Sequence, residues 1–139
     1  MIEEVLENLQ NREAFEEYLW SVASRLDCYE VASSFLGKLG YSEQELIGLS
    51  SLAAWDYGRT VYIARWSVAA GYLNEEEAWQ YMRTAAENAA ERYTDWREYI
   101  AAYVIGRAVG YGDNCMDIYP TLNYLLKNNE SPLNKAQFK

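Results

Sequence analysis

Two arginines are the residues whose placement suggests chemistry, because each falls on the apolar stripe of a predicted helix. Arg59 lies on the stripe of a helix expected over residues 52–70, and Arg107 on that of a helix expected over 95–109. The first stripe also contains Leu52, Trp55, Ile63, Trp66 and Ala70. A guanidinium among apolar side chains is costly unless it is paired. Asp56 precedes Arg59 by three residues, a spacing at which helix side chains meet, so we expect both arginines to point inward and to share this carboxylate.

This arrangement has two interpretations. In the structural one, which we favour because structural ion pairs resemble sites, Asp56 and the two arginines form a buried network that orients two helices. Tyrosine hydroxyls such as that of Tyr103 would complete its hydrogen bonds. In the functional one, Arg59 and Arg107 form a fork that binds a carboxylate or a phosphate. Asp56 would then be the available general base, and Tyr57 or Tyr103 the acid.

Glycines support a close contact at the same place. Gly58 and Gly106 each directly precede one of the two arginines. Glycine costs stability inside a helix, so its use at both positions indicates a close backbone approach between the two helices.

The residue types exclude many kinds of catalytic site. The chain has no histidine, which removes His-based acid–base chemistry and the Ser-His-Asp arrangement. Cys28 and Cys115 are too few for an ordinary zinc site, and we expect free thiols, with a disulfide between them as the alternative. No Gly-rich phosphate loop or nucleophile elbow is present. We therefore expect no metal and no cofactor, and we lean against an enzyme.

Charge and aromatic content favour a protein partner. The formal net charge is −9 and the sequence pI is near 4.5, which disfavours nucleic acid and anionic membranes and suits a basic protein. The alternative is that the charge only keeps the domain soluble. Among many tyrosines and tryptophans, Tyr57, Trp79 and Tyr111 are candidate exposed anchors for that partner. The N-terminus does not resemble a signal peptide and no apolar run is long enough to span a membrane, so we expect a cytoplasmic protein.

Helical periodicity and caps predict an all-α, compact, single-domain bundle of about six to seven helices. The domain is expected over residues 1–128, with a polar, loosely held tail over 129–139. Three separate helices are expected before residue 41, over residues 2–10, over residues 13–26, and from a cap at Asp27 to Gly40. Capping boxes at Ser42 and Asn74 predict two later helix starts, and Thr94 is expected to cap the helix that carries Arg107.

The same residues carry a resemblance to a known family. The matching segments are Trp55-Asp56-Tyr57-Gly58-Arg59, Gly71-Tyr72 with Glu76-Glu77-Ala78-Trp79, Asp95-Trp96 with Tyr103-Val104-Ile105-Gly106-Arg107, and Ser131-Pro132. From about Leu52 to Leu133, the chain resembles the bacterial family catalogued as domain of unknown function 1266. Family members usually carry an aromatic residue after the Ser-Pro, where this chain has Leu133. The resemblance implies a helical bacterial domain and no known activity, so no catalytic residue is carried over.

Two functional hypotheses follow. The first is a non-catalytic protein-binding module, most concretely an immunity- or antitoxin-like protein that neutralises a basic bacterial toxin. The second is a domain or enzyme that binds a small anion through Arg59, Arg107 and Asp56.

Overall fold

A computed structural model describes residues 2–112 and 115–139, with residues 2–9 described by their backbone only. The described part of the chain is all-α and contains no strand, as predicted. Its elements are α1 (Ile2–Lys38), α2 (Glu43–Ile47), α3 (Ala54–Ala69), α4 (Glu75–Arg92), α5 (Trp96–Tyr111), α6 (Tyr119–Lys127), and the 3-10 helices η1 (Met116–Ile118) and η2 (Pro132–Asn134).

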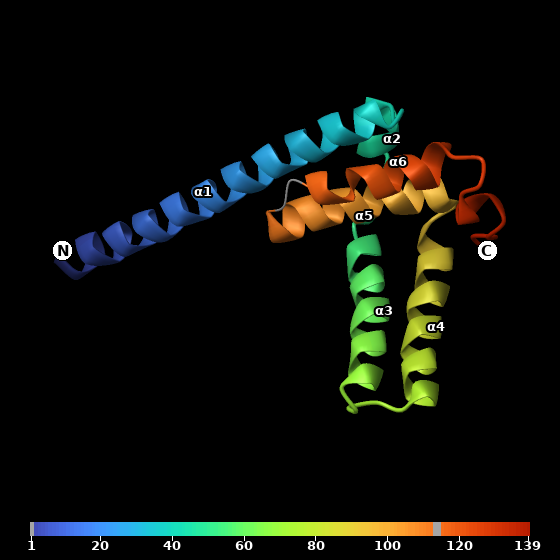
Figure 1. Ribbon diagram of the computed structural model, residues 1–139. Helices are drawn as coiled ribbons and strands as arrows, with labels where there is room; N and C mark the ends of the chain where they lie inside the picture. Colours follow the sequence, from blue (N-terminus) through green and yellow to red (C-terminus); the bar gives the residue numbers. More distant parts are fainter. Residues whose placement is uncertain (1, 113–114) are drawn as a thin grey trace.

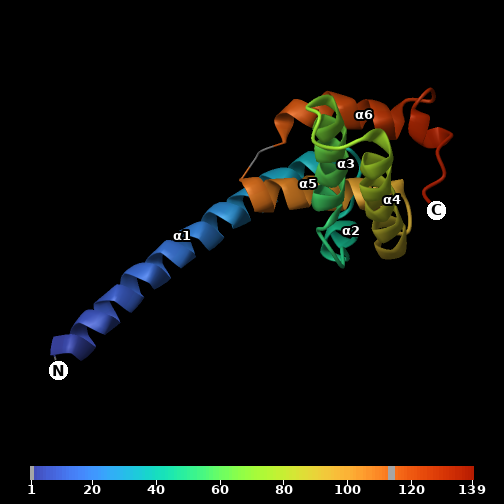
Figure 2. The same cartoon turned by 90° about the horizontal axis from the view of Figure 1, so that it is seen from below.

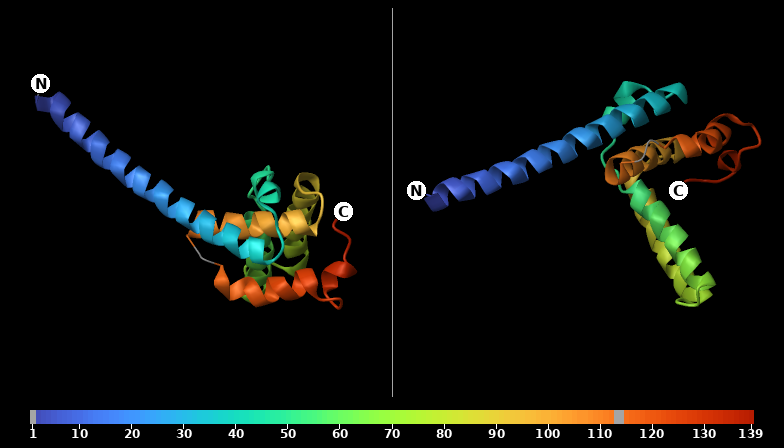
Figure 3. Two further views of the ribbon diagram at one scale, coloured as in Figure 1. Left: turned by 90° about the horizontal axis from the view of Figure 1, so that it is seen from above. Right: turned by 60° about the vertical axis from the view of Figure 1, so that its left-hand side comes forward.

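Helix α5 lies at the centre of this arrangement (Figure 1). α1 crosses it on one side, α6 runs beside it, and the hairpin formed by α3 and α4 projects from it on another side (Figures 1 and 3). The N-terminal part of α1 extends away from all other helices (Figure 2). Helix α5, which carries Arg107, therefore contacts both α1 and the hairpin.

The prediction of three short helices before residue 41 is wrong, because α1 is one continuous helix over Ile2–Lys38. Residues 1–36 contain neither glycine nor proline, so no residue there ends a helix. Asp27, which we expected to cap a new helix, lies inside α1 and is exposed. Gly40 ends the turn after α1 with a positive φ of 97°, a conformation that favours glycine.

Caps define the later helices. Ser42 and Asn74 form the two predicted capping boxes, in which the side chain and backbone of the N-cap residue exchange hydrogen bonds with a glutamate three residues on. Helix α5 is capped by Asp95 instead of Thr94, since Asp95 Oδ1 accepts a hydrogen bond from the Glu98 N–H at 2.8 Å. Thr94 instead donates to the Glu98 carboxylate.

Two buried clusters hold these helices together. The larger one packs the C-terminal part of α1 and α6 against α5. Its largest fully buried aliphatic side chains are Leu36, Val104 and Ile105. The smaller one joins α3, α4 and α5 around Tyr93, whose hydroxyl donates to Ser51 O and accepts from the Ala54 N–H, both at 3.0 Å. Both bonds fix the entry to α3.

The predicted close approach of α3 and α5 is confirmed at the two glycines. A Cβ at Gly106 would lie 2.5 Å from the Leu52 carbonyl oxygen, and one at Gly58 would lie 2.8 Å from the Tyr103 ring. Both distances are below van der Waals contact, so only glycine permits this crossing.

The prediction that the apolar stripe of α3 faces inward is wrong for its C-terminal half. Ile63 and Trp66 are exposed, the latter to 60%, whereas Trp55 at the start of the helix lies against α5. Helix α3 instead turns its small residues toward α4, which presents alanines of its own. The buried small residues are Ala54 and Ala64 of α3 and Ala78, Ala85 and Ala89 of α4. Small side chains let the two helices pack closely, and this leaves the large side chains of α3 on the outside.

The tail, expected to be loosely held, packs on the domain. Ser131 is fully buried, and its hydroxyl donates to Leu125 O at 2.7 Å and accepts from the Leu133 N–H. Further on, the Phe138 ring meets the Trp96 ring edge-on at 5.0 Å, and Trp96 Nε1 donates to a tail carbonyl. The aromatic residues of α5 therefore anchor the C-terminal segment.

Candidate functional site

An open cleft of about 430 Å³ lies where α3 crosses the end of α5. It is lined by Leu52, Ala53, Trp55, Asp56, Arg59, Gly106, Val109, Gly110 and Tyr111. Trp55 and Tyr111 both line it, and their rings meet edge-on at 5.5 Å. The absence of a side chain at Gly106 allows Trp55 to lie against α5.

Both arginines lie around the Trp55 ring. The Arg59 Cζ is 5.9 Å from the centre of that ring and 5.2 Å from the centre of the Tyr111 ring. The Arg107 Cζ is 5.7 Å from the Trp55 ring. Aromatic faces attract guanidinium groups at such distances. The structure thus brings the two predicted arginines to one tryptophan, whose Nε1 is buried without a hydrogen-bond partner.

The carboxylate beside Arg107 is Asp117, not Asp56. Arg107 Nη2 lies 3.2 Å from Asp117 Oδ2, and only 16% of the Arg107 side chain is exposed. Within residues 2–112 and 115–139, no ion pair joins Asp56 to either arginine. Asp56 is exposed at the edge of the cleft. The expected sharing of Asp56 therefore does not form.

Tyr103 lies beneath the cleft at the crossing of the two helices. It is half-buried, and its ring meets the Trp55 ring edge-on at 5.2 Å. Burial raises the pKa of the Tyr103 hydroxyl above its ordinary value, and burial also raises that of Tyr99 to about 12. Both hydroxyls therefore stay protonated at neutral pH, and Tyr99 donates to Ala54 O at 3.3 Å.

The three candidate anchors have different surroundings. Tyr57 is half-buried and packs against the smaller core. Trp79 and Tyr111 are exposed, the first on α4 and the second in the cleft. Whether any of them contacts a partner stays a prediction.

A second hollow, of about 340 Å³, lies between α3 and α4 near the hairpin turn. Its lining is Thr60, Ile63, Ala64, Ser67, Tyr72, Leu73 and Tyr81. Tyr72 is 82% exposed, and Ile63 and Tyr81 are more than half exposed. We call Ile63, Tyr72 and Tyr81 the hairpin face. The sequence analysis places Ile63 on an inward stripe and gives none of these residues a binding role, because an outward apolar stripe has the same periodicity as an inward one.

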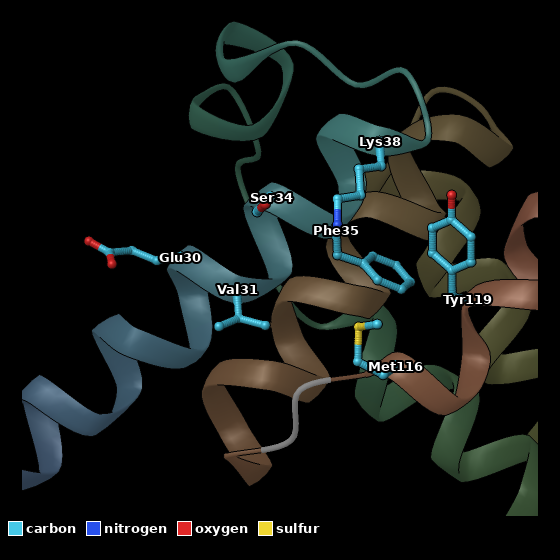
Figure 4. A pocket seen from close by; sticks show the side chains of 7 residues that line it. All are labelled: Glu30, Val31, Ser34, Phe35, Lys38, Met116 and Tyr119. Carbon is cyan, nitrogen blue, oxygen red and sulfur yellow. The ribbon is translucent and has the colours of Figure 1, made fainter.

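A third hollow, of about 570 Å³, lies between α1 and the segment that leads into α6 (Figure 4). Val31, Phe35, Met116 and Tyr119 give it apolar walls. Glu30 also belongs to its lining, but Figure 4 shows this carboxylate directed away from Met116. The hollow therefore offers apolar surface without a cluster of reactive groups.

A polar contact between α2 and α5 was also missed. Arg97 donates to both oxygens of Glu45, at 2.7 and 3.1 Å, and to Gly40 O at 2.7 Å. Its guanidinium lies 4.0 Å above the Tyr41 ring. The hydrogen bond from Arg97 lowers the pKa of Glu45 to about 2. Because Glu45 and Arg97 are 52 residues apart, no local spacing could have revealed this pair.

No helix in the described ranges is long and apolar enough to cross a bilayer. Among the same residues, no group of three or more Cys, Asp or Glu side chains is placed to hold a metal ion.

Comparisons with known proteins extend the resemblance over nearly the whole chain. A family model described as a protein of unknown function, DUF1266, matches residues 3–138. The uncharacterised protein YbeR of Escherichia coli strain K12 is 35% identical over 66 residues, which are 48% of this chain and 28% of YbeR. The uncharacterised protein YbeU of the same strain is 31% identical over 70 residues, which are 50% of this chain and 30% of YbeU. The matched segment is thus less than a third of each relative, and no solved structure matches.

Proposed function

We propose that this chain, which belongs to the DUF1266 family, is a non-catalytic protein-binding module that docks its partner on the hairpin face. The observation that carries the proposal is the exposure of large aromatic side chains around the hollow between α3 and α4. Exposed apolar surface of this kind is typical of interaction sites, and tyrosine is enriched among the residues that dominate binding energy.

The hollow suits an apolar side chain of the partner. Its walls are mainly apolar, and Tyr72 and Tyr81 stand at its edge. Tyrosine rings supply a large contact area and a polar hydroxyl with little loss of conformational freedom. A partner residue that enters the hollow would therefore be surrounded by rigid aromatic groups, which is the usual structure of a binding hot spot.

Charge supports a basic partner. The chain carries a net charge of −9, and three consecutive glutamates, Glu75 to Glu77, begin α4 directly after the hairpin turn. Acidic groups at the edge of an apolar surface steer basic proteins toward it and raise the association rate. In its most concrete form, the proposal is an immunity- or antitoxin-like protein that binds and neutralises a bacterial toxin.

A binding experiment with matched variants tests the proposal. The wild-type chain, the double variant Ile63→Ser/Tyr72→Ser, and the control Ile47→Ser, which changes an exposed residue of α2, would each be immobilised and exposed to extract of the source organism. We expect one protein to be retained by the wild type and the control and lost with the double variant. Binding should be reproduced with purified components, with an association rate that falls as salt rises.

Two results would contradict the proposal: no protein whose retention depends on the hairpin face, or equal binding by the double variant. For the toxin form, genes beside that of this chain would be expressed with and without it. A toxic neighbour whose effect is suppressed by the wild type and the control, but not by the double variant, is the expected result. A neighbour without toxicity contradicts that form only.

The Arg59 cleft favours a second candidate function, the binding of a small anion. Within the described residues Arg59 forms no ion pair, and its guanidinium stands between Trp55 and Tyr111 in an open cleft. Asp56 lines the same cleft, so a carboxylate that also carries an N–H donor fits better than inorganic phosphate. A thermal-shift screen of carboxylates, phosphates and nucleotides tests it, because a ligand raises the unfolding temperature. No stabilisation at millimolar concentration, or equal stabilisation of Arg59→Met, would refute it.

A further inference from the structure

The cleft between α3 and the end of α5 contains one cation and one anion in its lining, Arg59 and Asp56. Both side chains project from α3 and are three residues apart, a spacing that puts their Cβ atoms about 5–6 Å from each other. Among the described residues, however, no ion pair joins them. Arg107, the other arginine at the Trp55 ring, is already paired with Asp117. A ligand in the cleft therefore meets one positive group beside one negative group.

The guanidinium of Arg59 is oriented before any ligand arrives. Its Cζ lies 5.2 Å from the centre of the Tyr111 ring and 5.9 Å from that of the Trp55 ring, distances at which aromatic faces attract a cation. A guanidinium presents its N–H donors in a rigid fork that matches a carboxylate. Because the aromatic rings already restrict Arg59, little conformational freedom is lost when a carboxylate binds to it.

The remaining walls of the cleft are apolar and leave room for a side chain. Leu52, Ala53 and Val109 line it. At Gly110 an added Cβ would meet nothing within 4 Å, so the cleft is open on that side. Its volume of about 430 Å³ falls in the range of sites that hold small molecules. The cleft can therefore accommodate an aliphatic group in addition to two charged groups.

We propose that this cleft binds the zwitterion of an apolar α-amino acid of about the size of leucine. The carboxylate pairs with Arg59, the ammonium group pairs with Asp56, and the aliphatic side chain packs on Leu52 and Val109. An α-amino acid carries both charges on one carbon atom, so it can reach two neighbouring side chains of the same helix. This proposal rests on the small-anion function proposed for the Arg59 cleft and specifies its ligand.

Other small ligands leave one of the two charges without a partner. A phosphate or a simple carboxylate would pair with Arg59 and be repelled by Asp56, whereas an amine would pair with Asp56 and be repelled by Arg59. The amide N–H of a peptide's C-terminal residue donates a hydrogen bond but carries no charge. Electrostatic complementarity to both side chains therefore selects a free amino acid.

Nuclear magnetic resonance titration of the full chain tests the ligand class. The probe is the indole N–H signal of Trp55, which lines the cleft and is identified by its loss in Trp55→Phe. We expect leucine to shift this signal to saturation and to leave the signal of Trp20, on α1, unchanged. 4-Methylpentanoate, which has the same side chain and carboxylate but no amino group, should bind about fivefold more weakly. Leucinamide, which lacks the carboxylate, should bind about tenfold more weakly.

Variants separate the two charges. Arg59→Met should raise the dissociation constant for leucine about tenfold. Asp56→Asn should raise it about fivefold, because Asp56 is exposed, and should abolish the preference for leucine over 4-methylpentanoate. The matched controls are Arg65→Met, at an exposed position of the same helix, and Asp27→Asn, at an exposed position of α1. Both should bind leucine like the wild type, and circular dichroism would verify that every variant is folded.

The outcomes distinguish the amino-acid proposal from the anion function on which it rests. If 4-methylpentanoate bound as tightly as leucine, or if Asp56→Asn kept the preference for leucine, the amino acid would be refuted as the ligand while anion binding would stand. Equal effects of Arg59→Met and Arg65→Met would overturn the proposed position of the carboxylate. If leucine, 4-methylpentanoate and inorganic phosphate all left the Trp55 signal unchanged at millimolar concentration, both proposals would be wrong.

Discussion

Replacing Gly106 by alanine should destabilise the domain, although alanine is the better helix former. In an unobstructed helix the change would stabilise by about 0.5–1 kcal/mol. Here the added methyl group would lie 2.5 Å from the Leu52 carbonyl oxygen and 3.1 Å from Trp55 Cβ. Overpacking of this kind costs about 1–3 kcal/mol, and a backbone atom cannot give way as a side chain can. We expect a net loss of about 2 kcal/mol.

The measurement is the midpoint of reversible thermal unfolding, followed by circular dichroism. For a chain of this size each kcal/mol shifts the midpoint by about 3 °C, so Gly106→Ala should unfold about 6 °C below the wild type. The matched control is Gly110→Ala, one turn later in α5, where an added Cβ meets nothing within 4 Å. This variant should unfold at the wild-type temperature or about 2 °C above it.

The unfolding temperature of Gly58→Ala should lie between those of Gly106→Ala and Gly110→Ala. Its added methyl group would meet the Tyr103 ring at 2.8 Å, and a ring can shift more easily than a carbonyl group. If Gly106→Ala were as stable as Gly110→Ala, α3 and α5 would not cross as closely as we describe. The placement of Trp55 and both arginines in one cleft would then be refuted as well.

Three further predictions concern single contacts. Glu45→Gln should lower stability by about 1 kcal/mol at neutral pH, since the pair with Arg97 is partly exposed. Because the pKa of Glu45 is lowered on folding, the stabilisation by the Glu45–Arg97 pair is complete above the unfolded-state pKa of 4.5 and is lost as pH falls toward 2. A difference in unfolding temperature between wild type and Glu45→Gln that does not change with pH would contradict this. Ser131→Ala should cost about 1–2 kcal/mol in urea unfolding, because it leaves Leu125 O and the Leu133 N–H without the hydroxyl, whereas the exposed Ser34→Ala should be neutral. Tyr93→Phe should lower the free energy of unfolding in urea by about 1–2 kcal/mol, because it removes the hydrogen bonds to Ser51 O and the Ala54 N–H. If Tyr93→Phe were as stable as Tyr72→Phe, which changes an exposed residue, those hydrogen bonds would not stabilise the domain.

Local rules predicted the features that depend on neighbouring residues. The capping boxes at Ser42 and Asn74 are made by residues three apart, so the sequence contains all of the interacting groups. The glycines at the α3–α5 crossing were also recognisable, because a glycine inside a helix needs a reason. The same reasoning fails for α1, where it predicts a cap at Asp27 although no helix-ending residue precedes Asp27.

Features that depend on distant residues could not be predicted. The outward stripe of α3 has helical periodicity, but periodicity does not state which face is covered. That depends on α4, whose alanines select the small residues of α3 as neighbours. Likewise, the Asp117 carboxylate reaches Arg107 from beyond the turn after α5, whereas the prediction of Asp56 rests only on its spacing from Arg59.

The choice of small residues for the interior of the hairpin explains why the surface is aromatic. Ala64, Ala78 and Ala85 hold α3 and α4 together, and large side chains such as Trp66 and Tyr72 then have no place inside. Burying one such side chain would contribute about 1.5–3 kcal/mol, so leaving several of them exposed forgoes stability. α1 does the same with Phe15 and Leu19 at the other end of the molecule. The hairpin face would recover that free energy only when a partner covers it, so binding there should raise the unfolding temperature of the chain.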